Sequence, residues 1–304
     1  MIDFRTLVYP DLSQKNIVIT GASSVIGFET AEFFASKKAN VFLCSRSIQK
    51  GEKAKAEILT AYPQATIEVV QLDLSDIGSI EQAAITIQNK VDRIDILCNN
   101  AGIMAVPYGK TKDGFESQIG VNHLGHYVLT GLLFEKLDDS SRIVNVSSKA
   151  YLQGNVDPDD FMFEKGGYSP FKSYARSKLS NVLFTLELSK RIQMAGKNII
   201  VVAAHPGVAK TGLFDRDKQN TILSNMFNLF GRFLATAEHG AKAIITACID
   251  PDAISGNYYG PHRSKANQGN LIKLEKLNKI ASDQTHQAFL WEYSKSQTNI
   301  VYPI

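Results

Sequence analysis

The chain has 304 residues, of which 44% are hydrophobic and 21% are charged, and its formal net charge is +3. This length accommodates one large α/β domain or two small ones, and the composition is that of an ordinary folded globular protein. Lysine and arginine are spread along the sequence without a basic run, which argues against a nucleic-acid partner.

The cysteines and the N-terminus favour the same kind of compartment. Cys44, Cys98 and Cys248 are odd in number, far apart and flanked by apolar residues, which predicts buried free thiols and a reducing environment. Residues 1–14 contain neither a signal-peptide core nor an apolar run of about twenty residues. We therefore expect a cytoplasmic protein without a transmembrane segment.

Short apolar runs alternate with helical patterns along the chain. Strands covered on both faces are predicted where the runs are rich in β-branched residues, at 17–20, 41–44, 67–70, 94–97, 143–146 and 199–204. Helical periodicity lies between them, for example at 29–37 and 79–89. This alternation predicts a doubly wound, parallel, Rossmann-type sheet of about seven strands with helices on both faces.

The domain organisation follows from the same pattern. No low-complexity linker and no internal repeat interrupts the chain, so one domain over 1–304 is the simpler interpretation. We expect a cofactor half at about 14–150 and a catalytic and substrate half at about 151–304.

The first strand leads into a glycine-bearing turn at residues 20–27 and then into a helix. Backbone N–H groups and the positive end of the helix dipole attract phosphate at such a turn. Gly21 allows the tight turn, and Gly27 allows the helix to pack closely on the strand. An ordinary β–α turn has the same pattern, so this motif alone is weak evidence for a dinucleotide.

The second strand ends at Ser45, Arg46 and Ser47 without an acidic residue. A site for NAD usually has an acidic residue at this point for the ribose hydroxyls, whereas a site for NADP has an arginine. The planar guanidinium of Arg46 can pair with a 2′-phosphate, and either serine can add a hydroxyl. NADP(H) is therefore favoured over NAD(H), and a solvated surface arginine is the alternative.

Tyr174 and Lys178 lie four residues apart in a helical pattern, so both side chains point to one face. A lysine ammonium beside a tyrosine makes the phenolate less costly to form, which suits the tyrosine as a general acid or base. Tyr168 and Lys172 have the same spacing, but Pro170 lies between them and would break the helix that aligns them. Tyr174 is therefore the predicted catalytic tyrosine.

The histidines show no metal-ligand pattern. His123 and His126 lack a third ligand nearby, and His205 stands apart from both. We interpret these three as structural histidines and expect no metal.

Two segments are candidates for the substrate side. The stretch 222–234 is apolar around most of its girth, which fits a lid over a lipophilic substrate, a core or dimer-contact helix, or a peripheral membrane contact. The long loop predicted at 149–173 could form one wall of the substrate mouth.

Seven motifs in order resemble the short-chain dehydrogenase/reductase family, and within it the retinol-dehydrogenase-like branch. They are the turn at Thr20–Gly27, Asp73-Leu74, Asn99-Asn100-Ala101-Gly102, Val121-Asn122, Val146-Ser147-Ser148, Tyr174-Ala175-Arg176-Ser177-Lys178 and Pro206-Gly207-Val208-Ala209-Lys210-Thr211. Many members of that branch carry an N-terminal membrane anchor, which we do not expect here because residues 1–14 have no long apolar run, so a retinoid substrate does not follow from the resemblance.

The resemblance implies a catalytic set of Asn122, Ser148, Tyr174 and Lys178. Ser148 would donate a hydrogen bond to the substrate oxygen, and Asn122 would anchor a water that feeds protons through Lys178. A homodimer through the helix at 171–191 is also implied. The implied cofactor contacts are Gly21, Ser23, Ser24, Val25, Ile26, Gly27, Arg46, Asp73, Leu74, Asn100, Ala101, Gly102, Tyr174, Lys178, Pro206, Gly207, Val208 and Thr211.

Val25 departs from the family pattern, which has glycine at this position of the phosphate turn. A β-branched side chain restricts the backbone and projects toward the pyrophosphate, which would weaken binding by about 1–3 kcal/mol. The expected function is an NADP(H)-dependent oxidoreductase acting on a small, lipophilic carbonyl or alcohol substrate. The alternative is a cofactor-poor binding or regulatory protein on the same fold.

Overall fold

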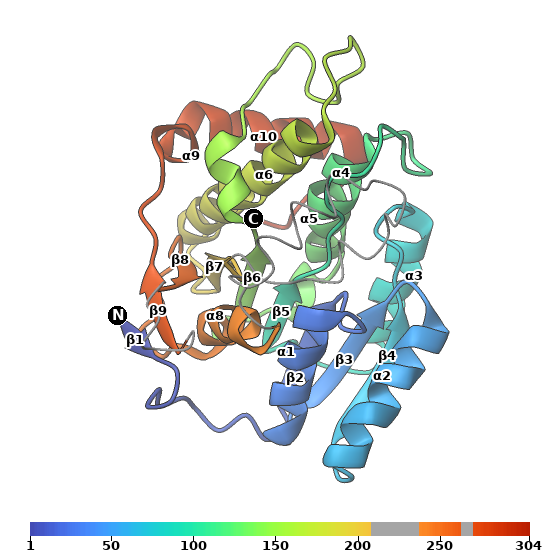
Figure 1. The fold of residues 1–304 in the computed structure, drawn as a ribbon, viewed down its shortest axis with the longest axis vertical. Coiled ribbons are helices and arrows are strands. Elements are labelled where there is room, and N and C mark those ends of the chain that lie inside the picture. The colour runs from blue at the N-terminus through green and yellow to red at the C-terminus, as the bar shows by residue number, and fades with distance from the viewer. Residues whose placement is uncertain (208–236, 263–269) are drawn as a thin grey trace, which may run out of the picture.

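The computed structural model describes residues 1–207, 237–262 and 270–304 of the chain. Its strands form one sheet in the order β1-β9-β8-β7-β6-β5-β2-β3-β4 (Figure 1). The strands are β1 (Ile2–Asp3), β2 (Asn16–Thr20), β3 (Asn40–Ser45), β4 (Thr66–Gln71), β5 (Ile96–Asn99), β6 (Arg142–Val146), β7 (Ile200–Ala204), β8 (Tyr258–Pro261) and β9 (Leu271–Leu274).

The sheet contains a parallel, doubly wound centre, as the sequence predicts. All pairings from β4 across to β8 are parallel, and these strands number seven. The predicted total of about seven is nevertheless too low, because β9 pairs antiparallel with β8 and β1 pairs antiparallel with β9. β1 has only 2 residues and β9 only 4, which is too short for a hydrophobic period to show in the sequence.

Helices cover both faces of the sheet (Figure 1). The α-helices of the described chain are α1 (Val25–Ser36), α2 (Ile48–Ala61), α3 (Ile77–Gln88), α4 (Ser117–Ile119), α5 (Gly125–Leu132), α6 (Pro170–Met194), α8 (Ala237–Ile249), α9 (Lys279–Ser282) and α10 (Gln284–Thr298). Shorter helical turns are η1 (Gly120–Leu124), η2 (Phe134–Lys136) and η3 (Lys149–Gln153).

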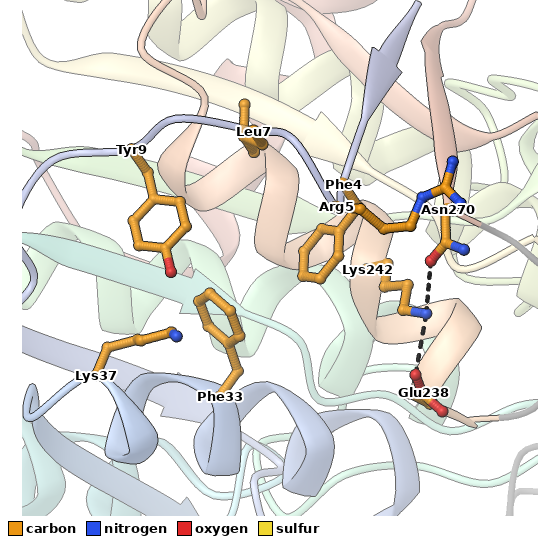
Figure 2. A pocket seen from close by; sticks show the side chains of 9 residues that line it. All are labelled: Phe4, Arg5, Leu7, Tyr9, Phe33, Lys37, Glu238, Lys242 and Asn270. Carbon is orange, nitrogen blue, oxygen red and sulfur yellow. Dashed lines mark hydrogen bonds and ion pairs between the residues drawn. The ribbon is translucent and has the colours of Figure 1, made fainter.

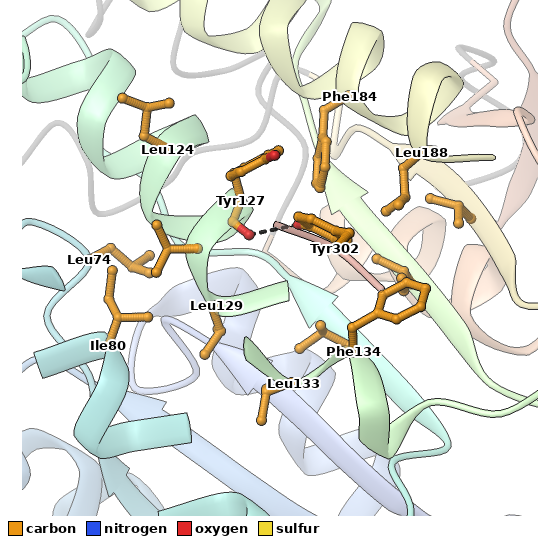
Figure 3. Packing of buried hydrophobic residues seen from close by; sticks show 14 of the residues in the cluster. Leu74, Ile80, Leu124, Tyr127, Leu129, Leu133, Phe134, Phe184, Leu188 and Tyr302 are labelled. Carbon is orange, nitrogen blue, oxygen red and sulfur yellow. Dashed lines mark hydrogen bonds between the residues drawn. The ribbon is translucent and has the colours of Figure 1, made fainter. Parts of the chain in front are cut away.

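Alternate residues of each strand face opposite cores. Val18 of β2 packs in the core under α3, α5 and α6, whereas its neighbours Ile17 and Ile19 pack in the core under α1, α2 and α8. All three side chains are fully buried. Figure 3 shows part of the first core, where Leu74 and Ile80 lie next to each other.

The C-terminal helix α10 lies on α6 (Figure 1). The Trp291 ring of α10 stacks on Phe184 of α6 with centroids 6.3 Å apart, and it meets the Tyr127 ring of α5 at 5.5 Å. Tyr302 closes the cluster by donating to the backbone oxygen of Tyr127 at 2.6 Å (Figure 3). The part of α6 that packs on α10 is therefore unavailable to a second copy of the chain.

Cys44, Cys98 and Cys248 are buried free thiols, as the sequence predicts. Burial raises the pKa of Cys44 to about 12, so this thiol is protonated at neutral pH. Among the residues described, no helix is long and apolar enough to cross a membrane.

Candidate active site

The predicted site residues gather where neighbouring parallel strands end. β2 ends at Thr20, β5 at Asn99, β6 at Val146 and β7 at Ala204, and these strands are consecutive in the sheet. In doubly wound sheets, ligands bind outside the carboxyl ends of the strands. The motifs after these ends therefore share one edge of the sheet.

The turn after β2 is shaped by two glycines. Gly21 has a φ of +67°, which favours glycine. A Cβ on Gly21 would lie 2.9 Å from the Cα of Ala101, and one on Gly27 would collide with the Gly21 carbonyl oxygen. The turn, α1 and the segment after β5 are consequently in backbone contact, which is the close packing predicted for a phosphate turn.

Val25 occupies a strained position in the same turn. Its φ is +22°, in the region that β-branched residues rarely adopt. The preceding N-cap residue, Ser24, uses its hydroxyl to bond the Gly21 carbonyl at 2.9 Å and gives α1 no side-chain cap. The β-branched residue that distinguishes this turn in the sequence therefore also has a strained backbone.

The donors at this turn fit an anionic cofactor. The first-turn N–H groups of α1 have no acceptor within the helix, because the ladder of backbone bonds has not begun there. The hydroxyls of Ser23 and Ser45 are bonded at 2.7 Å, which joins the turn to the end of β3. Arg46 follows on the surface, is exposed, and has no carboxylate partner in the part of the chain that the structure describes.

The segments at 73–74 and 100–102 lie next to this turn in different ways. Asp73 uses one carboxylate oxygen to accept from the Ser75 backbone and hydroxyl, at 2.9 and 2.6 Å. Leu74 is buried in the core. Asn100 donates from its side chain to the Thr20 carbonyl at 2.8 Å, which fixes the 100–102 segment to the end of β2.

A buried histidine connects this segment to Asn122. The Thr20 hydroxyl oxygen accepts from the backbone N–H groups of Asn100 and Ala101, both at 2.9 Å. His126 lies 2.9 Å from the same hydroxyl through Nε2 and 3.0 Å from the Asn122 carbonyl through Nδ1. Burial lowers the pKa of His126 to about 4, so the ring is neutral; Nδ1–H donates to Asn122 and Nε2 accepts from Thr20.

Asn122 lies in η1, a π-helical turn, and its side chain is held firmly. Its amide exchanges two hydrogen bonds with the backbone of Ile103, at 2.8 and 2.9 Å. The same nitrogen donates to the Ser177 hydroxyl at 2.9 Å. Asn122 therefore joins the 100–103 segment to α6, one residue before Lys178.

Tyr174 and Ser148 meet at the end of β6. Tyr174 is 8% exposed, and its burial raises the pKa of the phenol, whereas a hydrogen bond from Ser148 lowers it. Ser147 points elsewhere, because its hydroxyl donates to the Lys178 carbonyl at 2.7 Å. Of the two serines, only Ser148 thus faces the tyrosine.

Lys178 completes the group from the next turn of α6. Its ammonium donates to the Val146 carbonyl at 3.0 Å and lies 5.8 Å from the centre of the Tyr174 ring. Burial lowers its pKa to about 8. A methyl group on Gly102 would lie 3.3 Å from this ammonium and 3.1 Å from the Asn122 oxygen, so the four predicted catalytic residues form one cluster.

Tyr168 is excluded from this cluster by the start of α6. The helix begins at Pro170, which stands at its first position rather than interrupting it. The Tyr168 hydroxyl donates to the Val106 carbonyl at 2.7 Å and accepts from Gln118 at 3.1 Å. Tyr168 therefore lies outside the helix, as the sequence reasoning requires.

The segment between Ser148 and α6 is shorter than the loop predicted at 149–173, because η3 and the first turn of α6 take both ends. The remaining loop is tied to α6 by Arg176, which is 2% exposed. Its guanidinium donates to the carbonyls of Asp160 and Phe161 at 2.8 and 2.7 Å and lies 3.9 Å from the centre of the Phe163 ring. Local sequence pattern does not indicate this anchor, because Arg176 and the two carbonyls are 15 and 16 residues apart in the chain.

Pro206 and Gly207 follow β7 at the same edge of the sheet, beside β6. Val208 and Thr211, the other two predicted contacts of this motif, lie outside the described residues. So does the apolar stretch 222–234.

No metal is predicted for the described residues, and these residues also line a cavity. Within 1–207, 237–262 and 270–304, no three His, Cys, Asp or Glu side chains are placed to hold a metal ion. A cavity of about 470 Å³ lies between the N-terminal segment, α1 and α8, with Phe4, Tyr9, Phe33 and Lys242 in its lining (Figure 2). None of its lining residues belongs to the predicted cofactor or catalytic sets, so it is a separate feature.

Comparison with known proteins identifies the family. Residues 15–221 match the family model described as short chain dehydrogenase. Since this match covers more than half of the chain, the chain belongs to the short-chain dehydrogenase family.

Its relatives define the branch of that family. The chain is 42% identical over 252 residues to retinol dehydrogenase 12 of Homo sapiens, which covers 82% of this chain and 78% of that protein. It is 40% identical over 252 residues to retinol dehydrogenase 11 of Homo sapiens, with 82% and 77% covered. The protein is thus a retinol-dehydrogenase-like oxidoreductase that acts on an alcohol or a carbonyl.

Solved structures agree with the fold. An uncharacterized protein from Mycobacterium paratuberculosis is 34% identical and has a TM-score of 0.80, with 99% of both chains covered. A short chain dehydrogenase from Shigella flexneri complexed with NADP has a TM-score of 0.63 at 21% identity, covering 82% of this chain and 98% of its own. The second likeness shows the fold alone.

Proposed function

We propose that this protein is an NADP(H)-dependent oxidoreductase in which Tyr174 is the general acid and base for a carbonyl or alcohol substrate. The observation that carries the proposal is the cluster of Tyr174, Ser148, Lys178 and Asn122 at the end of β6, beside a phosphate-type turn. The catalytic cluster and the phosphate-type turn belong to one continuous sheet, which supports a single domain over 1–304.

The chemistry assigned to the residues follows from their positions. A bound nicotinamide cofactor would supply or accept the hydride. Tyr174 passes a proton to the substrate oxygen, and Ser148 donates a hydrogen bond to the same oxygen. Lys178 carries positive charge next to the phenol, which favours the phenolate that remains after proton transfer. Asn122 holds the 100–103 segment against α6 and so fixes the distance between cofactor side and catalytic side.

Arg46 supports the preference for NADP(H) over NAD(H). Its guanidinium is exposed at the end of β3, near the hydroxyl pair of Ser23 and Ser45, and is free to form a bidentate pair with a 2′-phosphate. An acidic residue, which would favour the ribose hydroxyls of NAD, is missing from residues 44–47.

The substrate class and the compartment are part of the proposal. The names of the relatives, which are retinol dehydrogenases, support an apolar substrate, and the buried free thiols support a reducing compartment such as the cytoplasm.

A fluorescence titration with NADPH and, separately, with NADH tests the cofactor. We expect the native chain to bind NADPH more tightly than NADH. Arg46→Ala should weaken NADPH binding by about 10- to 100-fold, the worth of a charge-assisted pair, and should leave NADH binding unchanged. Equal affinities for both cofactors in the native chain would refute the preference.

The second candidate function is a cofactor-poor binding protein, which the positive φ of Val25 favours. It predicts that the native chain binds neither cofactor and that Val25→Gly restores binding. The same titration therefore separates the two candidates.

A further inference from the structure

His205 is the first residue after the end of β7. It directly precedes the Pro206–Gly207 turn, is fully buried, and takes no part in the functions assigned above. The phosphate-type turn follows β2 and the catalytic serine follows β6, which neighbours β7. The turn after β7 thus lies on the reacting side of the site, away from the phosphate side.

Both ring nitrogens of His205 have defined partners. The Gly207 backbone N–H donates to Nδ1 at 2.9 Å, and Nε2 lies 3.1 Å from a carboxylate oxygen of Glu275. Burial lowers the pKa of His205, whereas the pKa of Glu275 is lowered to about 2, chiefly by the bond to His205. The ring is therefore neutral, Nε2–H donates to an ionised carboxylate, and bare Nδ1 accepts from the turn.

The hydrogen bond between His205 and Glu275 requires a glycine at position 260. A Cβ on Gly260 of β8 would lie 2.7 Å from Cε1 and 2.8 Å from Cδ2 of the imidazole. Any other residue at 260 would displace the ring from the carboxylate. The Tyr258 ring also packs against the imidazole, with the two ring centres 5.2 Å apart.

Glu275 also contacts the catalytic side. One of its oxygens lies 3.3 Å from the ammonium of Lys149, the residue after Ser148, and the other lies 3.1 Å from Lys273. One carboxylate thus connects the turn after β7, through His205, with the turn after β6, through Lys149.

We infer that His205 and Glu275 are a positioning pair that sets the Pro206–Gly207 turn for the nicotinamide end of the cofactor and couples it to the Ser148 turn. This inference rests on the proposed function. His205 keeps Gly207 in its positive-φ conformation, +74°, by accepting its N–H. Removing the acceptor leaves that N–H without a partner and lets the turn change conformation.

The test compares two ligands that share the phosphate side of the site. NADPH reaches both sides, whereas adenosine 2′,5′-bisphosphate occupies only the phosphate side. In His205→Phe and in Glu275→Leu, we expect the Kd for NADPH to rise about tenfold or more and the Kd for the bisphosphate to stay within about twofold. Glu275→Gln keeps an oxygen acceptor for Nε2–H and should restore most of the NADPH affinity.

Two variants serve as matched controls. His286→Phe makes the same substitution on α10, away from the site, and Lys273→Ala removes only the outer ion pair of Glu275; both should bind NADPH as the native chain does. If the Kd values for NADPH and for the bisphosphate rise equally in His205→Phe, the residue has a general structural role and the inference is overturned. An unchanged Kd for NADPH would also overturn it.

A measurement on the native chain tests the His205–Glu275 pair even if the variants do not fold. Long-range ¹H–¹⁵N NMR should show His205 protonated at Nε2 only, and a proton at Nδ1 would overturn the pair. Failure of the proposed function has a different signature, because the native chain would then bind neither NADPH nor NADH whatever the tautomer of His205.

Discussion

The phosphate-type turn at 20–27 and the first turns of α6 line the same edge of the sheet, but they are built in different ways. In the turn, Val25 has a φ of +22°, and α1 begins without a side-chain cap. In α6, Tyr174 and Lys178 are buried, and the lysine donates to the end of β6. The turn therefore stores strain, whereas the catalytic face is fixed by hydrogen bonds before any ligand arrives.

The difference separates two tasks of the site. Groups that act on developing charge are effective when they are already oriented, because no reorganisation is then needed during the reaction. A phosphate turn contributes mainly to affinity, which can fall without changing the chemistry. Substitutions in α6 should consequently change kcat, and substitutions in the turn should change Kd.

The largest effect is expected from Tyr174→Phe. Loss of the hydroxyl removes the proton donor while the ring still fills its site, so kcat should fall by about 10²–10⁴-fold and the Kd for NADPH should change little. Steady-state kinetics with NADPH and an apolar aldehyde, together with a fluorescence titration, measure both quantities. An unchanged kcat would remove Tyr174 from the mechanism.

Lys178 should make stability depend on pH. Burial lowers its pKa to about 8 in the folded chain, so the unfolded chain holds more protons between about pH 8 and its ordinary value of 10.5. The contribution of Lys178 to the free energy of unfolding is therefore fully present above pH 10.5 and is lost as the pH falls through about 8. The free energy of unfolding should rise across this window by an amount of order 3 kcal/mol.

Urea denaturation of the native chain and of Lys178→Met, at both ends of that window, isolates this contribution. Tyrosines and other lysines titrate in both proteins and cancel in the difference. A difference between the two proteins that does not vary with pH would contradict the burial of a titrating ammonium.

Val25→Gly should act on affinity alone. Glycine accepts the positive φ and removes the side chain that projects toward the phosphates, so NADPH should bind more tightly by about 1–3 kcal/mol, or roughly 5- to 150-fold. Val25→Ala is the matched control, because it keeps a Cβ but loses the β-branch, and it should show a smaller gain. If kcat rather than Kd responds, the separation of tasks is wrong.

Much of the fold and of the catalytic set follows from local sequence pattern. Six of the seven parallel strands, β2 to β7, overlap the apolar runs that the sequence shows, although β5 begins at Ile96 rather than at residue 94. The seventh, β8, matches none of those runs. Tyr174, Ser148, Lys178 and Asn122 fall in one cluster. Their roles, and those of the cofactor residues, stay predictions.

The rest depends on contacts between distant segments, which no local pattern encodes. His126 meets Thr20 across more than a hundred residues, and His205 meets Glu275 across seventy. Their sequence neighbourhoods predicted only structural histidines. Likewise, the helical period of α6 does not reveal that α10 covers part of this helix, where Trp291 packs on Phe184. A homodimer through the helix at 171–191 stays a prediction.

The smallest effect is expected from Tyr168→Phe, which tests the choice between two pairs of equal spacing. The Tyr168 hydroxyl bonds the Val106 carbonyl and Gln118, and it lies before the helix that carries Lys178. Its loss should lower the free energy of unfolding by about 1 kcal/mol, the usual worth of such a bond, and leave kcat within about twofold. Urea denaturation and the kinetics used for Tyr174→Phe provide both numbers. A fall in kcat as large as that of Tyr174→Phe would show that the start of α6 does not decide which tyrosine acts.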